Sequence, residues 1–267
     1  MRTAKTVLTV IQERGKQKKP IERVYKLLFN RELYLNAYAK LYPNNGAMTK
    51  GVTNETVDGM SIQKIDRMIE ILREEKYQWK PARREYIKKK NGKKRPLGIP
   101  VWGDKVLQEV MRQILEAYYE PQFSEHSHGF RPNRGCHTAL QEIQVWKGTR
   151  WFIEGDISQY FDTIDHKILL EILARNIHDG RFIRLVSNML KAGYLEEWKF
   201  KQTISGVPQG GVISPILANI YLNEFDNWIE EVLIPKYTKG KRQKSNPEYN
   251  KLTAEIQKLS LQIKSQG

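Results

Sequence analysis

The chain has 267 residues, and its 40% hydrophobic content is enough to bury the core of one large domain or two small ones. Its net charge of +15 is concentrated in residues 76–95 (+9) and 236–264 (+6), which is typical of proteins that bind a polyphosphate, although two solvated basic surfaces are the alternative. The single cysteine excludes an intrachain disulfide, and the lack of a signal sequence and of a long apolar stretch excludes a secreted or membrane-spanning chain, so the sequence predicts a cytoplasmic protein.

The first part of the chain predicts two helices separated by a loop. Apolar residues recur at helical spacing over residues 20–41, which indicates an amphipathic helix. Residues 42–60 are rich in Gly, Asn and Thr and predict a long loop. Ser61 is a typical N-cap, so a second helix is expected over residues 62–76.

A hairpin and two further helices are expected next. Asn91-Gly92 predicts the turn of a hairpin over residues 83–99, because both residue types tolerate positive φ. A helix is expected from Asp104 to about residue 119, where Pro121 would stop it, and another over about 137–147.

The second half alternates apolar runs with helical patterns. The run at 151–156 predicts a strand, and Ser214-Pro215 predicts the start of a helix that reaches about residue 233. Further helices are expected over about 163–175 and 181–192, and a short hairpin over 195–204. The predicted fold class is therefore α+β, helix-rich, with small antiparallel β elements.

The last segment carries an apolar stripe on a basic helix. The stripe has intervals of three and four residues, and such a face needs something to pack on. We therefore expect this chain to be a piece of a longer protein. An alternative is that the stripes of two copies pack together in a homodimer. The stripe consists of Tyr249, Leu252, Ile256, Leu259 and Ile263.

Asp156 is the strongest candidate for chemistry in the chain. It is expected at the end of the 151–156 strand, where a carboxylate can bind a hard cation such as Mg²⁺ that activates phosphates. Asp162 and Asp165 fit helix capping better, and Glu154 is a weaker metal candidate. The flexible Pro-Gln-Gly-Gly stretch at 208–211 would let a substrate lie against backbone, so the two stretches together predict a nucleotidyl-transfer site.

Several motifs occur in an order that resembles reverse transcriptases, specifically the RNA-directed DNA polymerases of group II intron-encoded maturases of the mitochondrial-like type. The resemblance covers about residues 20–235. A retron or diversity-generating reverse transcriptase fits less well, because the Thr-Val-Asp-Gly-Met stretch and the basic tail are more similar to intron proteins. The matching blocks are Val52 to Met60, Tyr86 to Pro100, Phe123-Ser-Glu-His-Ser-His-Gly-Phe-Arg-Pro-Asn-Arg-Gly-Cys-His, Glu154-Gly-Asp-Ile-Ser-Gln-Tyr-Phe-Asp and Gly206-Val-Pro-Gln-Gly-Gly-Val-Ile-Ser-Pro.

The resemblance implies a right-hand polymerase with fingers and a partial palm. The N-terminal extension would be helical and span residues 1–80, with a loop at about 42–60 that faces RNA. The fingers would span 81–150, the partial palm 151–235, and a basic helical insertion 236–267.

The resemblance also implies roles for single residues. Asp156 would be the catalytic carboxylate and would bind two Mg²⁺ ions together with the carbonyl of Ile157. Phe161 would exclude a 2′-hydroxyl and so favour deoxynucleotides, although packing in the core is its alternative role. Lys89 and Arg95 would hold the triphosphate of the dNTP, and Gln209 would lie near the new base pair. The residues expected to contact template RNA are Lys88, Lys93, Lys94, Arg131 and Arg134.

The sequence departs from the family pattern in one respect that matters for activity. The Tyr-Ala-Asp-Asp block of the family, which supplies further metal carboxylates, has no counterpart, since no Asp-Asp pair occurs in this sequence. The chain alone is therefore expected to have little polymerase activity. The alternative function is an intron-RNA-binding module that aids splicing without catalysis. In both cases the expected partners are an RNA template and intron RNA, with a DNA primer and dNTP for the enzyme.

A zinc site is a further alternative for the block at 123–137. Structural zinc requires four well-placed ligands, usually with paired Cys or His spacing, and the spacing here fits that pattern poorly. The residues in question are His126, His128, Cys136 and His137.

Overall fold

The computed structural model of the chain describes residues 2–88, 92, 94–146, 152–197, 199–203, 205–206, 210–238 and 246–265. It contains two compact units, Met1–Asp226 and Asn227–Gly267, which are considered separately below. None of the helices in the described ranges combines the length and the apolarity that a membrane crossing requires.

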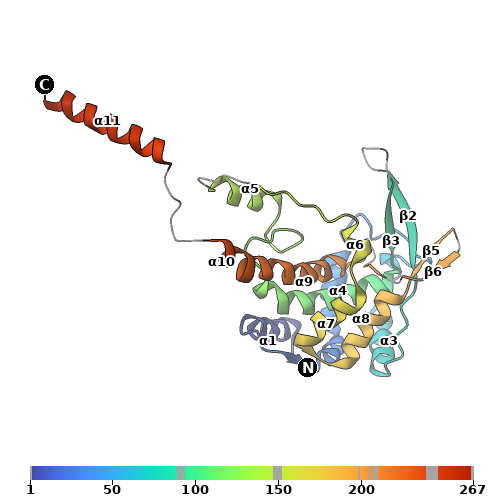
Figure 1. Cartoon of the computed structure of the whole chain (residues 1–267). Helices are drawn as coiled ribbons and strands as arrows, with labels where there is room; N and C mark the ends of the chain where they lie inside the picture. The colour runs from blue at the N-terminus through green and yellow to red at the C-terminus, as the bar shows by residue number, and fades with distance from the viewer. Residues whose placement is uncertain are drawn as a thin grey trace. The chain divides into compact units, whose positions relative to one another are not determined.

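Helix α4 (Trp102–Tyr119) is the central support of the first unit (Figure 1). Its apolar side chains are buried along nearly its whole length, and α1 (Ala4–Lys16) and α2 (Arg31–Leu41) pack against it. The contact with α1 is close, because a Cβ on Gly15 would lie 2.1 Å from the carbonyl oxygen of Tyr118. Only glycine fits at this crossing. The sequence analysis did not anticipate α1.

The single helix expected over 20–41 is wrong. The chain forms the short strand β1 (Ile21–Glu22) and the 3₁₀ helix η1 (Val24–Phe29) before α2 begins. Asn30 separates η1 from α2 and caps α2, because its side chain accepts a hydrogen bond from the backbone N–H of Glu32 at 3.0 Å. An asparagine at this place stabilises a new helix start rather than a continuous helix.

The predicted cap at Ser61 is confirmed. Its hydroxyl accepts a hydrogen bond from the backbone N–H of Lys64, and helix α3 (Ile62–Arg73) follows, ending three residues earlier than expected. A 3₁₀ turn, η2 (Val57–Gly59), precedes it within the loop expected at 42–60.

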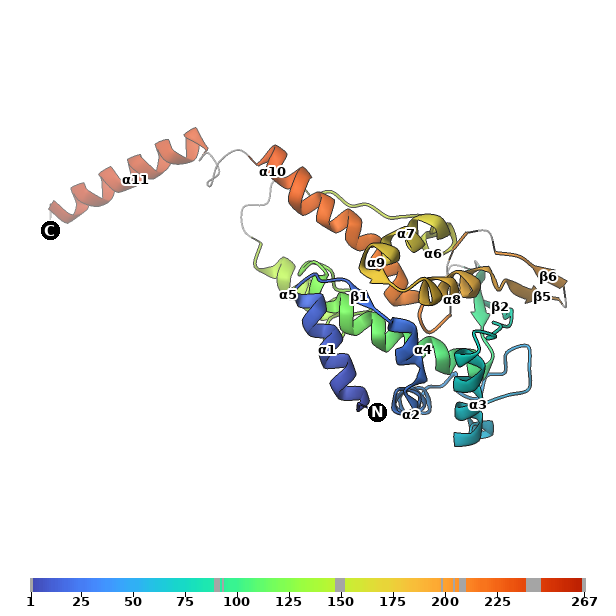
Figure 2. The same cartoon turned by 90° about the horizontal axis from the view of Figure 1, so that it is seen from below.

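Both predicted hairpins are confirmed, and they belong to one sheet (Figures 1 and 2). Strands β2 (Ala82–Lys88) and β3 (Lys94–Ile99) are antiparallel, as are β5 (Tyr194–Glu196) and β6 (Lys199–Lys201). The two hairpins meet through a parallel pairing of β2 with β5, which was not expected. A second parallel pair joins β1 to β4 (Ile177–His178).

The remaining helices of the first unit agree broadly with the sequence. Asp165 caps α7 by accepting from the N–H of Ile168, whereas Asp162 lies inside the short helix α6 and does not cap α7, so that part of the prediction is wrong. These elements are η3 (Glu120–Gln122), α5 (Cys136–Gln144), α6 (Tyr160–Thr163), α7 (His166–Asn176), α8 (Gly180–Lys191) and α9 (Ser214–Trp228).

The strand expected at 151–156 is wrong for the described residues. Residues 152–157 have no regular secondary structure, and the side chains of Phe152 and Ile153 are 70% and 93% exposed. A β-strand is stable only when it pairs with a neighbour, and no strand in the described part of the chain pairs with this segment.

The second unit is helical. The π-helix Ile229–Leu233 and α10 (Ile234–Tyr237) follow α9, and α11 (Pro247–Ser265) comes last. The five residues of the predicted stripe lie on α11, as expected, and all of them are exposed.

Candidate functional site

The 205–212 loop is anchored at its first end to the turn between α6 and α7. The N–H of Gly206 donates to the carbonyl of Ile164 at 2.8 Å, and the hydroxyl of Ser205 donates to the carbonyl of Asp162 at 3.1 Å. In turn the carbonyl of Gly206 accepts from Nε2 of His166 at 2.7 Å. Gly206 has φ +90°, and an added Cβ would lie 2.8 Å from the Cα of Asp162. Both the backbone angle and the lack of space require glycine here.

The other end of this loop is anchored to the β2–β3 hairpin and to α4. Gly210 has φ +105°, and a Cβ on it would lie 2.7 Å from the carbonyl oxygen of Gly98 in β3. Two residues later, the N–H of Val212 donates to Oε1 of the buried Gln108 at 2.9 Å. A cavity of about 210 Å³ lies beside this contact and is lined by Gly98, Gly210 and Val212, among others. The loop therefore joins the α6–α7 turn to the hairpin.

Phe161 lies between this loop and the 123–135 segment. Its ring meets the ring of Phe130 edge-on at 6.4 Å and that of Tyr160 at 5.7 Å. Tyr160 is fixed to α9, since its hydroxyl donates to the carbonyl of Ala218 at 2.8 Å. Burial, with a smaller effect of Tyr221, raises the pKa of Tyr160 and keeps this hydroxyl a donor. Phe161 itself is only partly buried, so its ring borders both the core and solvent.

Asp156 and Ile157 lie in the exposed 152–157 segment, just before α6. Among the described residues no group of three or more His, Cys, Asp or Glu side chains is placed to hold a metal ion. One carboxylate and one carbonyl are fewer oxygen ligands than Mg²⁺ requires. The donor set in the described residues therefore does not make a complete magnesium site.

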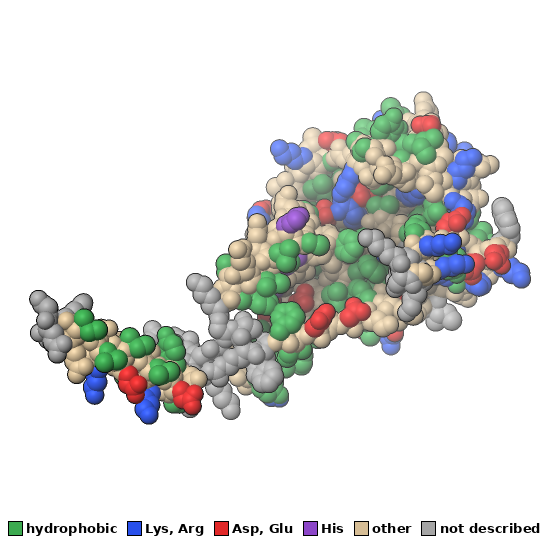
Figure 3. Space-filling model, turned by 90° about the horizontal axis from the view of Figure 1, so that it is seen from above, with side chains coloured by type: hydrophobic (Ala, Val, Ile, Leu, Met, Phe, Trp, Pro, Cys, Tyr) green, Lys and Arg blue, Asp and Glu red, His purple; other side chains and the backbone are tan. Residues whose placement is uncertain are grey.

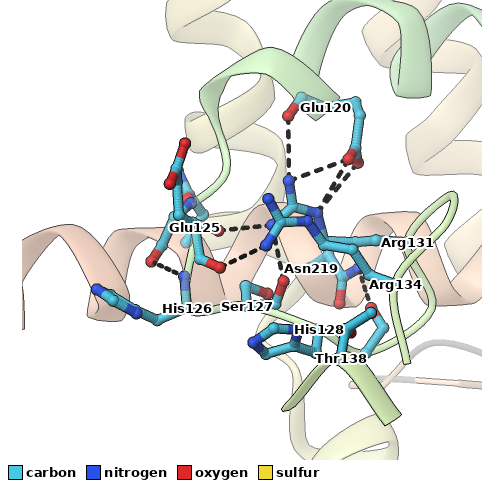
Figure 4. Close-up of polar contacts among 12 residues, drawn as sticks. Glu120, Glu125, His126, Ser127, His128, Arg131, Arg134, Thr138 and Asn219 are labelled. Atoms are coloured by element: carbon cyan, nitrogen blue, oxygen red, sulfur yellow. Dashed lines mark hydrogen bonds and ion pairs between the residues drawn. The ribbon is translucent and has the colours of Figure 1, made fainter. Parts of the chain in front are cut away.

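Arg131 is buried and bonded within the protein (Figure 4). Its guanidinium donates to the carboxylate of Glu120 at 3.0–3.2 Å and to the carbonyls of Ser124 and Ser127, and it lies 5.3 Å from the ring centre of Phe123. The expectation that Arg131 contacts template RNA directly does not fit this environment, because its donors are already used. Arg131 instead holds the 123–131 segment in shape at the end of α4.

The rest of this segment is fixed by α5 and α9 (Figure 4). Asn219 of α9 donates to the carbonyl of Gly129 at 2.8 Å, and Arg134, which is more exposed than Arg131, donates to the carbonyl of Glu125. His128 and His126 both lie against the carboxylate of Glu142, and their hydrogen bonds lower the pKa of Glu142.

The ends of β2 and β3 next to their connection are basic and exposed in the described residues. Lys88 and Lys94 lie directly opposite each other in the β2–β3 register, and Arg95 follows on β3. Like charges at facing positions destabilise a strand pair, and a polyanion would relieve this repulsion. Lys89, Lys93 and Gln209 lie outside the described residues. In the view from above, exposed hydrophobic side chains lie between separate groups of Lys and Arg side chains (Figure 3).

Sequence reasoning missed several residues that build the site. They are polar residues whose partners lie far away along the chain, so no local pattern marks them. His166 and Gln108 hold the two ends of the loop, Glu120 neutralises Arg131, and Asn219 fixes the carbonyl of Gly129.

Comparisons with known proteins identify the family of the chain. The profile of the family "Reverse transcriptase (RNA-dependent DNA polymerase)" matches residues 87–241. The chain is 47% identical over 244 residues to the group II intron-encoded protein LtrA of Lactococcus lactis subsp. cremoris, which covers 91% of this chain and 41% of LtrA. It is also 47% identical over 237 residues to an uncharacterized 91 kDa protein in the cob intron of Schizosaccharomyces pombe, covering 86% of this chain and 29% of that protein.

A solved structure shares the fold. A chain of a partial Cas6-RT-Cas1–Cas2 complex aligns with a TM-score of 0.51 and 20% identity, over 78% of this chain and 35% of that chain. The aligned part of this chain corresponds to about two fifths of the length of LtrA. The match over more than half of its residues shows that this chain belongs to the reverse transcriptase family, and its relatives include group II intron-encoded proteins.

Proposed function

We propose that the chain is the fingers and part of the palm of an RNA-directed DNA polymerase encoded by a group II intron. The observation that carries the proposal is the 205–212 loop, which is tied at one end to the segment after Phe161 and at the other to Gly98 of the fingers hairpin. A substrate lying on this loop would touch both the hairpin that grips phosphates and the ring that borders the sugar. The 47% identity to LtrA supports the same assignment.

In this proposal the chain's own residues bind and orient the substrates. Arg95 and Lys89 hold the triphosphate of the dNTP, because guanidinium and ammonium groups donate to phosphate oxygens. Phe161 contacts the sugar and leaves no room for a 2′-hydroxyl, and Gln209 rests against the new base pair. Lys88, Lys93, Lys94 and Arg134 contact the template RNA, to which a DNA primer is paired.

Asp156 and the carbonyl of Ile157 would contribute to a magnesium site. Since the described residues do not complete that site, its other ligands would come from elsewhere in the longer protein. For the same reason we expect little primer extension by the 267-residue chain alone.

The test is primer extension by a longer intron-encoded protein that includes this chain. We expect Asp156→Ala to lower the extension rate by about a thousandfold or more while RNA binding is retained, because a metal ligand of this kind acts on the chemical step. Glu171→Ala, which removes an exposed carboxylate on α7, is the matched control and should leave the rate unchanged. Ordinary extension by the Asp156→Ala protein would contradict the proposal.

A second candidate function is an RNA-binding module that aids splicing, and the facing pair Lys88 and Lys94 favours it. Binding of RNA that falls steeply with salt, without any requirement for dNTP or Mg²⁺, would support the module. Loss of metal-dependent dNTP binding on Asp156→Ala would support the polymerase site.

Self-association is a separate proposal that rests on the exposed stripe of α11. Light scattering coupled to size-exclusion chromatography tests it, and a monomer at high protein concentration would contradict it.

A further inference from the structure

One cavity in the described residues lies away from the 205–212 loop. It has a volume of about 450 Å³ and opens between η2, α3, residues 76–80 and the first turn of α4. None of the residues of the 123–135, 156–162 or 205–212 segments lines it. We call it the α3 cavity.

The inner part of the α3 cavity is apolar. Met60, Met68, Ile71 and Trp102 form it, and the first three are half-buried. Thioether and indole groups make favourable contacts with flat aromatic rings. Trp102 is only 3% exposed, and its Nε1 has no acceptor among the described residues. A flat heterocycle would offer the half-buried methionines a stacking surface.

The mouth of the α3 cavity is cationic. Lys64 is paired with Glu55 at 3.6 Å and Lys76 with Glu74 at 2.9 Å, whereas no ion pair within 4 Å engages Arg67 or Lys80 in the described part of the chain. Two exposed cations that form no salt bridge within 4 Å among the described residues, beside an apolar pocket, suit a phosphate group.

Asp104 lies close enough to Lys80 to offset part of its charge, since burial raises the pKa of this carboxyl and the charge of Lys80 acts to lower it, whereas Arg67 is not among the main groups that act on Asp104. Its carboxylate is buried, and it accepts hydrogen bonds from the Tyr77 hydroxyl at 2.6 Å and from the N–H of Lys80 at 3.1 Å. These bonds hold residues 77–80 against α4 and so fix one wall of the cavity. Asp104 therefore positions the wall and also lines the cavity.

A flat heterocycle joined to a phosphate is a nucleotide, and a cavity of about 450 Å³ falls within the usual range for small-ligand sites. We propose that the α3 cavity binds one unstacked nucleotide of a single-stranded RNA, with the base against Met60, Met68 and Trp102 and the phosphate at Arg67 and Lys80. The proposal rests on the proposed function, since it supposes an RNA partner. Proteins commonly recognise single-stranded RNA by binding bases that are turned out of the stack.

The test is photocrosslinking of the 267-residue chain to a short single-stranded RNA that carries 4-thiouridine, followed by mapping of the crosslinked peptides. We expect crosslinks in the tryptic peptides 51–64 and 68–73, which contain Met60, Met68 and Ile71. Arg67→Glu should reduce these crosslinks about fivefold or more, since losing a phosphate contact and adding a negative charge both weaken binding. In this variant trypsin no longer cuts after residue 67, so the second peptide to follow is 65–73. Lys5→Glu, the same charge change at an exposed site on α1, should leave them unchanged.

A second variant tests the pocket without changing charge. Met68→Phe fills the cavity, and we expect it to reduce crosslinking while the salt dependence of RNA binding stays the same, because phosphate contacts are kept. Circular dichroism checks that each variant is folded. Adenosine monophosphate is included as a competitor: if it occupies the cavity while RNA does not crosslink there, the site takes free nucleotides and the RNA proposal is overturned.

The failures of the two proposals differ. If the unmodified chain binds no RNA at all, the proposed function fails together with this inference. If the chain binds RNA but crosslinks only outside peptides 51–64 and 68–73, equally in all variants, then the inference about the α3 cavity alone is wrong.

Discussion

Nε2 of His166 donates a hydrogen bond to the carbonyl of Gly206 at 2.7 Å, across forty residues of sequence. His166 is buried at the start of α7, so the bond fixes the loop to a rigid helix rather than to another loop. The positions of the two ends of the 205–212 loop depend on such long-range bonds.

Gly206→Ala is expected to lower the free energy of unfolding by about 2 kcal/mol or more, since the residue has positive φ and the new Cβ would clash with backbone. Urea denaturation followed by circular dichroism measures the change. Gly155→Ala is the control, because nothing lies within 4 Å of a Cβ at that position. Equal stability of the two variants would show that the loop is not anchored as described.

Arg131→Ala is expected to lower the free energy of unfolding by about 3 kcal/mol, because it leaves the carboxylate of Glu120 and two backbone carbonyls without their donor. Arg134→Ala removes a more exposed guanidinium with one bond to a carbonyl, and its cost should stay below about 1 kcal/mol. If instead Arg131→Ala weakens RNA binding without loss of stability, then Arg131 contacts RNA directly after all.

Asp104 should make stability depend on pH. Burial raises the pKa of Asp104 from 3.8 to about 6, although the bonds from Tyr77 and Lys80 act in the opposite direction. Between these two values the folded state holds a proton that the unfolded state has released, so the contribution of this carboxyl to stability is full below pH 3.8 and is lost as the pH rises through 6.

The test is the substitution Asp104→Asn. It removes the titratable carboxyl, and the asparagine side chain can still form hydrogen bonds with Tyr77 and Lys80. As pH rises from about 4 to about 7, the unfolding free energy of the parent chain should fall relative to that of the variant by about 3 kcal/mol. Urea denaturation at several pH values provides the comparison, and Asp58→Asn, at an exposed site, is the control. A difference that does not vary with pH would argue against a buried, protonatable Asp104.

Lys88→Gln should weaken RNA binding and reduce the slope of log K against log salt by about 0.7 to 1, as expected for one lost phosphate contact. The same change should leave thermal stability equal or slightly higher, because it removes the repulsion from Lys94 across the hairpin. Lys5→Gln on α1 serves as the control for charge alone. An unchanged salt slope would place the RNA away from the hairpin tip.

Local patterns were sufficient for much of the fold. The Asn-Gly pair predicted the β2–β3 hairpin, Ser61 predicted the start of α3, and apolar spacing predicted α8 and α11. These features are set by residues close together in sequence. The family, too, followed from the order of its motif blocks.

The errors arose where distant partners decide the structure. Phe152 and Ile153 are strand-forming residues, but no neighbouring strand among the described residues pairs with them, so the local preference is not realised. Arg131 has the residue type of an RNA contact, but Glu120 binds it, and nothing nearby in sequence indicates that pairing. The anchoring of the loop by His166 and Gln108 was missed for the same reason.

The burial of α4 has a consequence for genetics. The helix packs against α1 and α2, and it positions Gln108 at the loop and Asp104 at the α3 cavity. Glu120, which binds Arg131, directly follows its last residue. In a random mutagenesis screen, inactive clones with changes in this helix would chiefly report protein that does not accumulate, and a blot for the protein should be run before any of them is assigned to the copying of RNA.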